Sequence, residues 1–151
     1  KLGVLKTLLL AFTWTYVTGY LPLYAVGMES TGVAAWFLLF RFSFMLILCL
    51  LFDNRDIRVD QLRGFSSLAT HLSALSVRRL TAALLLLMLV SGWQMLANGA
   101  PETVMIPVVA GIMLNGLIYF FSLKKQGYFF YYFVVDGSMV ITAFIIWLSV
   151  T

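Results

Sequence analysis

Five long stretches of the sequence are almost purely apolar, and they cover residues 7–26, 33–52, 80–97, 103–123 and 128–150. Each is close to the length of about 20 residues that a helix needs to cross the hydrocarbon core of a bilayer. The alternation of apolar and polar residues that marks a membrane β-barrel is missing. The composition agrees, since 62% of the residues are hydrophobic and only 11% are charged. We therefore expect an all-α polytopic bundle of five transmembrane helices surrounded by the lipid bilayer.

The charged residues between these stretches predict how the chain is oriented in the membrane. The connections on one side, residues 27–32 and 98–102, contain Glu29 and Glu102 but no basic residue. By the positive-inside rule the N-terminus and the loop 53–79 are cytoplasmic and the C-terminus is outside. The basic residues on the cytoplasmic side are Lys1, Lys6, Arg55, Arg58, Arg63, Arg78, Arg79, Lys124 and Lys125. Topology thus explains the net charge of +4 without nucleic acid as a partner.

Three acidic residues lie close together at the start of the loop 53–79. Asp53, Asp56 and Asp60 are spaced i, i+3 and i+7, which places them within about 60° of one another on a helix. Carboxylates this close repel one another unless a cation compensates their charge. Hard carboxylate oxygens together with substrate phosphates suit Mg²⁺, and Arg63 lies near the same face as a candidate for direct contact with a phosphate. The pattern predicts a diphosphate held through Mg²⁺. The alternative is a solvated helix end stabilised by Asp–Arg pairs.

The run FDNRDIRVDQLRGFSSL, residues 52–68, resembles the second aspartate-rich motif of the UbiA-type intramembrane prenyltransferases. That motif has the form DxxDxxxD, followed by Gly and then by Ser or Thr before Leu. The resemblance implies a nine-helix fold with this motif between helices six and seven, so that the five stretches here correspond to helices five to nine. It also implies that Asp53, Asp56 and Asp60 bind Mg²⁺, with Asp56 and Asp60 the catalytic pair and Arg63 and Asp53 binding substrate. The matching residues are Asp53, Asp56, Asp60, Gly64, Ser67 and Leu68.

The function implied by this resemblance is a Mg²⁺-dependent transfer within the membrane, and we expect that membrane to be a bacterial inner membrane. A prenyl group would pass from a polyprenyl diphosphate to an aromatic or other lipophilic acceptor. The family's first motif, NDxxD, is absent from the sequence. We expect it in a missing N-terminal half, without which the 151 residues are inactive.

The sequence also differs from the family's pattern directly after Gly64. Phe65 and Ser66 stand where many family members carry Lys or Arg. The rival motif of CDP-alcohol phosphotransferases needs DGxxAR before the aspartates, and it is absent. The alternative from another functional class is a non-catalytic polytopic membrane protein, either a degenerate homologue or an ion-handling subunit.

Three polar residues lie deep within the apolar stretches, where they are costly and usually face the interior of the bundle. At 1.5 Å per residue, Arg41 lies about 18 Å and Asn115 and Asp136 about 14 Å from the cytoplasmic side. We expect an ion pair between Arg41 and Asp136, with Asn115 in the same polar layer. Cys49 and His71 have no ligand partners nearby, so we expect them to be a packing residue and a residue of an interfacial amphipathic helix that follows Gly64.

Overall fold

The computed structural model describes residues 2–28, 31–62, 74–123, 127 and 129–150, and no β-strand occurs among them. The prediction of an all-α fold is confirmed for these residues. The helical elements are α1 (Leu2–Thr15), η1 (Tyr16–Tyr20), α2 (Leu21–Ala25), α3 (Gly32–Leu62), α5 (Ala74–Ala97), η2 (Glu102–Val104), α6 (Met105–Ser122), η3 (Phe130–Val135) and α7 (Asp136–Val150). Two helices extend into the predicted loop 53–79, because α3 continues to Leu62 and α5 begins at Ala74.

Three helical segments are long and apolar enough to cross a membrane, and they are Gly32–Asp53, Leu75–Ala97 and Glu102–Ser122. The first and last predicted spans are helical as well, but a π-helical segment divides the first of them and forms the start of the last. The first runs without interruption through α1, η1 and α2, and the last runs through η3 and α7. The three long apolar helices indicate a membrane protein, whereas the total of five crossings stays a prediction.

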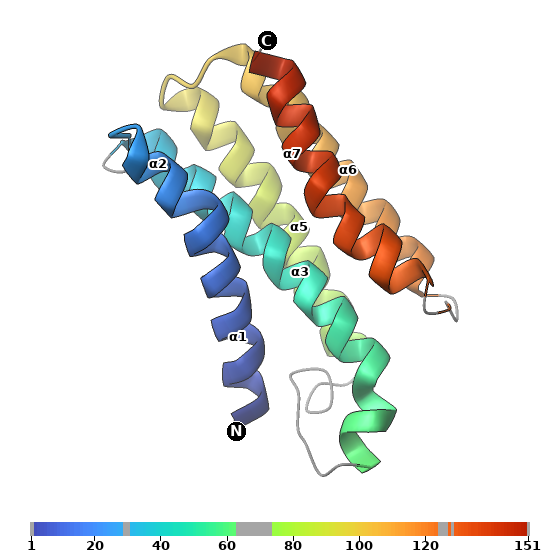
Figure 1. Ribbon diagram of the computed structural model, residues 1–151. Coiled ribbons are helices and arrows are strands. Elements are labelled where there is room, and N and C mark those ends of the chain that lie inside the picture. Colours follow the sequence, from blue (N-terminus) through green and yellow to red (C-terminus); the bar gives the residue numbers. More distant parts are fainter. Residues whose placement is uncertain (1, 29–30, 63–73, 124–126, 128, 151) are drawn as a thin grey trace.

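Helix α3 is the centre of the bundle (Figure 1). It packs against α1 on one side and against α5 on another, while α6 contacts both α3 and α5 and α7 packs on α6. The N-terminus and the last turns of α3 lie at one end of the molecule, and the C-terminus lies at the other (Figure 1).

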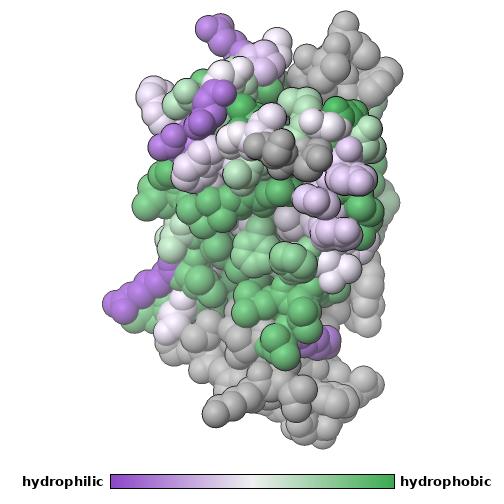
Figure 2. Space-filling model, turned by 90° about the vertical axis from the view of Figure 1, so that its left-hand side faces the viewer, coloured by the Kyte–Doolittle hydropathy of each residue, from purple (hydrophilic) through white to green (hydrophobic). Residues whose placement is uncertain are grey.

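The central position of α3 follows from its sequence, which is hydrophobic on every face between Phe42 and Phe52. In the three apolar segments the share of the residues buried inside the protein is 61% for α3, 33% for α5 and 22% for α6. Cys49 is among the buried residues of α3, as predicted for a packing residue. The other helices keep large apolar side chains on the outside, and hydrophobic residues cover much of the face shown in Figure 2. Such a surface suits contact with lipid.

Small residues explain how closely α1 approaches α3. Thr7, Ala11, Thr15 and Gly19 recur at every fourth position of α1 and η1, and all four are buried. Residues four apart lie on one helix face, and small side chains there let two helix backbones come close together. A Cβ atom on Gly19 would lie only 3.1 Å from Cδ2 of Leu38 on α3. The stripe fixes α1 against α3, and so determines which residues meet between the two helices.

Candidate functional site

The three aspartates of the predicted site lie on one continuous helix. The apolar segment of α3 ends at Asp53, but the helix continues to Leu62 and so includes Asp56 and Asp60. Their spacing of three and seven residues therefore places all three on one side of the helix backbone. The side chains of Asp56 and Asp60, and Arg63 altogether, lie outside the described residues, as does the segment around His71.

Asp53 contacts α1 through a hydrogen bond that the sequence analysis missed. The hydroxyl Oγ1 of Thr7 donates to the carboxylate oxygen Oδ2 of Asp53. Thr7 is almost fully buried, and Asp53 is half-buried at the end of the apolar segment. One carboxylate oxygen of the cluster thus helps to hold α1 against α3. The signal in the sequence was the stripe of small residues, which begins with Thr7.

The described residues alone do not complete a metal site. No group of three His, Cys, Asp or Glu side chains that could hold a metal ion is found among them. Of the three predicted ligands, only Asp53 has a described side chain. The donor set itself fits Mg²⁺, because it consists of hard carboxylate oxygens at helical spacing. The metal and the catalytic roles of Asp56 and Asp60 stay predictions.

Arg41 is buried as expected, but its predicted partner is wrong. The nitrogen Nη2 of Arg41 donates a hydrogen bond of 2.9 Å to Oγ1 of Thr18 on η1. No ion pair joins Arg41 to Asp136, although the structure describes both residues, and Asp136 is exposed at the start of α7. The prediction compared depths in the membrane, and depth does not tell which neighbouring helix a side chain faces.

The predicted polar layer does not form around Asn115 either. Asn115 is fully buried on α6, and its Nδ2 lies 3.8 Å from the Sδ atom of Met88 on α5. Its oxygen Oδ1 has no hydrogen-bond partner among the described residues. Asn115 therefore belongs to the contact between α5 and α6 and not to a layer with Arg41.

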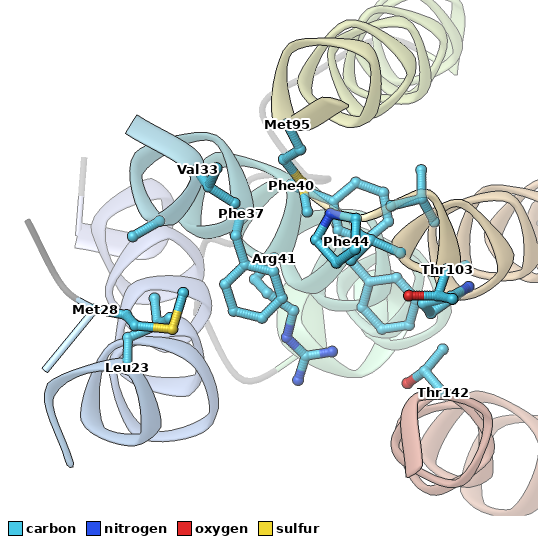
Figure 3. Close-up of a pocket in the computed structure, with 16 residues that line it drawn as sticks. Leu23, Met28, Val33, Phe37, Phe40, Arg41, Phe44, Met95, Thr103 and Thr142 are labelled. Atoms are coloured by element: carbon cyan, nitrogen blue, oxygen red, sulfur yellow. The ribbon is translucent and has the colours of Figure 1, made fainter. Parts of the chain in front are cut away.

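A cavity of about 270 Å³ lies next to Arg41 and is the second candidate site (Figure 3). The helical elements α2, α3, α5, η2, α6 and α7 contribute to its walls. The turn after α2 and the turn before η2 also contribute. The side chains are almost all apolar, apart from the Arg41 guanidinium group and the hydroxyls of Thr103 and Thr142. The lining residues are Leu23, Met28, Val33, Ala34, Phe37, Phe40, Arg41, Phe44, Met95, Pro101, Thr103, Val104, Pro107, Val108, Gly111 and Thr142.

The cavity and the aspartates lie at different levels of the same helix. Arg41 is twelve residues before Asp53, which corresponds to about 18 Å along a helix. The first site lies where α3 leaves its apolar segment, and the second lies within that segment. The two sites are therefore separate, and each needs its own functional explanation.

Comparison with protein-family models, with curated proteins and with solved structures found no match to this chain. The function is therefore inferred from the residues and their arrangement.

Proposed function

We propose that this chain is part of a Mg²⁺-dependent intramembrane prenyltransferase of the UbiA type. The observation that supports the proposal best is the position of the motif: Asp53, Asp56 and Asp60 follow one another on a helix that continues directly from an apolar, membrane-length segment. A substrate with a diphosphate head and a polyprenyl tail needs such a junction, because its head requires water and cations while its tail requires lipid.

In the proposed reaction the carboxylates of Asp56 and Asp60 bind the metal at the membrane surface, and Asp53 assists from its position beside Thr7. Mg²⁺ held by these carboxylates would supply positive charge against the negative charge of a diphosphate leaving group. Arg63 contributes a second positive charge to the same diphosphate. The apolar bundle keeps water from the allylic carbon, so that a lipophilic acceptor attacks it instead. The acceptor is an aromatic or other lipophilic molecule.

The proposal includes the topology of the whole enzyme. The five apolar stretches serve as helices five to nine of a nine-helix fold, with the loop after α3 on the cytoplasmic side of a bacterial inner membrane. An N-terminal half supplies the first aspartate motif, and the reacting groups meet between the two halves. The sequence upstream of residue 1 tests this part directly: an NDxxD motif between its second and third spans is expected.

Replacement of the aspartates by asparagine tests the metal site. We expect Asp56→Asn and Asp60→Asn each to lower the Mg²⁺-dependent binding of farnesyl diphosphate by about tenfold or more, because an amide is a poorer ligand for a hard cation. Asp53→Asn should have a smaller effect, since Oδ2 of Asp53 already accepts a hydrogen bond from Thr7. Binding is measured with radiolabelled diphosphate on protein in lipid nanodiscs, with and without Mg²⁺.

The matched control is Glu102→Gln, which removes one negative charge in the turn region at the opposite end of the bundle. This variant should bind like the wild-type protein. Wild-type binding by the Asp56→Asn, Asp60→Asn double variant would refute the metal site. A full-length wild-type protein that shows no Mg²⁺-dependent binding at all would favour the non-catalytic alternative, a degenerate homologue or an ion-handling subunit.

A further inference from the structure

The positive charge of the Arg41 side chain has no anionic partner among the described residues. Arg41 is 9% exposed, and the one hydrogen bond of its side chain to the described residues is donated by Nη2 to the neutral hydroxyl of Thr18. The guanidinium carbon lies 5.6 Å from the centre of the Phe44 ring, which adds a modest cation–π attraction. The nitrogen Nε has no hydrogen-bond partner among the described residues. A guanidinium group inside an apolar segment without an anion is costly.

The cavity beside Arg41 offers a place for the missing anion. Figure 3 shows the guanidinium group in the space between α2 and α7, with Phe37 and Phe44 on either side. None of the described residues that line the cavity carries a carboxylate. The guanidinium therefore stands as the one charged group of an otherwise apolar wall, and its planar fork of N–H donors matches a carboxylate.

Two features limit what can occupy this cavity. Its volume of about 270 Å³ lies near the low end of the roughly 300–1,000 Å³ that is usual for small-molecule pockets, which suits a compact molecule. A single arginine balances a single negative charge, so a diphosphate would bring excess charge into an apolar site. A monoanion with a small apolar body fits both limits.

The position of the charge along the cavity gives the orientation of the occupant. The residues at one end of the cavity, Met28 and Pro101, belong to the turns after α2 and before η2. Arg41 lies eight residues further along α3 than Val33, which is about 12 Å deeper into the bundle. The anionic group would lie at the deep end and the apolar body toward the turns. This is the reverse of a bilayer lipid, whose charged head stays at the surface.

We propose that the Arg41 cavity is a binding site for a compact lipophilic monocarboxylate, with the carboxylate on the Arg41 guanidinium beside Phe44 and the apolar body against Phe37 and Phe40. The site does not depend on the prenyl-transfer proposal, because it contains none of the aspartates and needs no metal.

Binding of octanoate, compared with 1-octanol of the same chain length, tests the proposal. We measure both by equilibrium dialysis against protein in zwitterionic nanodiscs, with EDTA present and empty nanodiscs as the blank. Wild-type protein should bind octanoate saturably, with one molecule per chain and about tenfold or more above octanol, because a charge-assisted pair is lost with the alcohol. Absence of saturable octanoate binding would overturn the proposal.

Variants assign the binding to Arg41. Arg41→Met should reduce the affinity for octanoate to that for octanol, whereas Arg79→Met, which removes an exposed arginine of α5, should leave it unchanged. Equal affinity in wild-type protein and Arg41→Met would overturn the assignment. Thr142→Leu keeps Arg41 but adds side-chain volume to the cavity wall. This variant tests binding in the cavity if Arg41→Met does not fold. Loss of octanoate binding is expected there, and wild-type binding would contradict the site.

The same assay tests whether the aspartate site and the Arg41 cavity bind their ligands independently. The Asp56→Asn, Asp60→Asn double variant should bind octanoate like the wild-type protein, even where its diphosphate binding is lost. A parallel loss of both ligands in this variant would contradict two independent sites.

Discussion

At the scale of single residues, two threonines of the first predicted span each form a hydrogen bond with a charged side chain of α3. Thr7 donates to Asp53, and Thr18 accepts from Arg41. Thr7 and Thr18 are eleven residues apart, whereas Arg41 and Asp53 are twelve apart, so the two antiparallel helices stay in register over about 17 Å. The polar contacts therefore lie at both ends of the α1–α3 interface. The burial of Arg41 was predicted from the sequence, but Thr18 was not, because apolar stretches give depth and not the direction of a side chain.

Replacement of Thr18 by valine tests how much its contact with Arg41 contributes to stability. We expect Thr18→Val to lower the free energy of unfolding by about 1–3 kcal/mol, because it leaves Nη2 of Arg41 without this acceptor in an apolar region. The measurement is thermal unfolding in detergent followed by circular dichroism. Thr13→Val is the matched control, since the hydroxyls of Thr13 and Thr18 both donate to the carbonyl four residues earlier, but Thr13 is exposed. Equal losses in the two variants would show that the Arg41 contact contributes nothing.

At the scale of elements, the apolar stretches predicted the helices, while their ends and contacts came only from the structure. Charged residues after Phe52 suggested that a loop begins at Asp53, yet α3 remains helical to Leu62. A helix needs no lipid to continue, because its backbone hydrogen bonds are internal. The sequence also could not predict which helices pack against each other, since an all-apolar helix has no amphipathic pattern to show which face is packed.

Two glycines allow a test of the α5–α6 contact. A Cβ atom on Gly92 of α5 would lie 2.5 Å from Cγ1 of Val108 on α6, whereas a Cβ atom on Gly116 of α6 would meet nothing within 4 Å. Gly92→Ala should therefore destabilise the bundle by about 1–3 kcal/mol through overpacking. Gly116→Ala should be neutral or stabilising by up to about 1 kcal/mol, since alanine favours the helix. Thermal unfolding of both variants in the same detergent checks the difference, and a Gly92→Ala variant as stable as Gly116→Ala would contradict the close contact.

At the scale of the whole molecule, the distribution of charge and the direction of the helices can be combined to predict the membrane topology. The end of α2, the start of α3 and the connection between α5 and α6 lie at the same end of the bundle as the C-terminus, and the N-terminus lies at the other end (Figure 1). With the basic end cytoplasmic, as the positive-inside rule predicts, five crossings would place the N-terminus inside and the C-terminus outside. The orientation is a prediction from the sequence, because charge bias acts during insertion. The sequence did not supply the arrangement around α3, which depends on how side chains pack.

Labelling of single cysteines from one side of the membrane tests the orientation and the number of crossings together. In a Cys49→Ser background, Thr31→Cys and Asn98→Cys should react with a membrane-impermeant maleimide in intact cells, because both residues are exposed in the outer turns. Lys6→Cys and Gly127→Cys, also at exposed positions, should react only after the membrane is permeabilised. Reaction of Lys6→Cys in intact cells would reverse the orientation. Reaction of Gly127→Cys on the same side as Asn98→Cys would mean that α6 does not cross the membrane, and the five-span topology would fail with it.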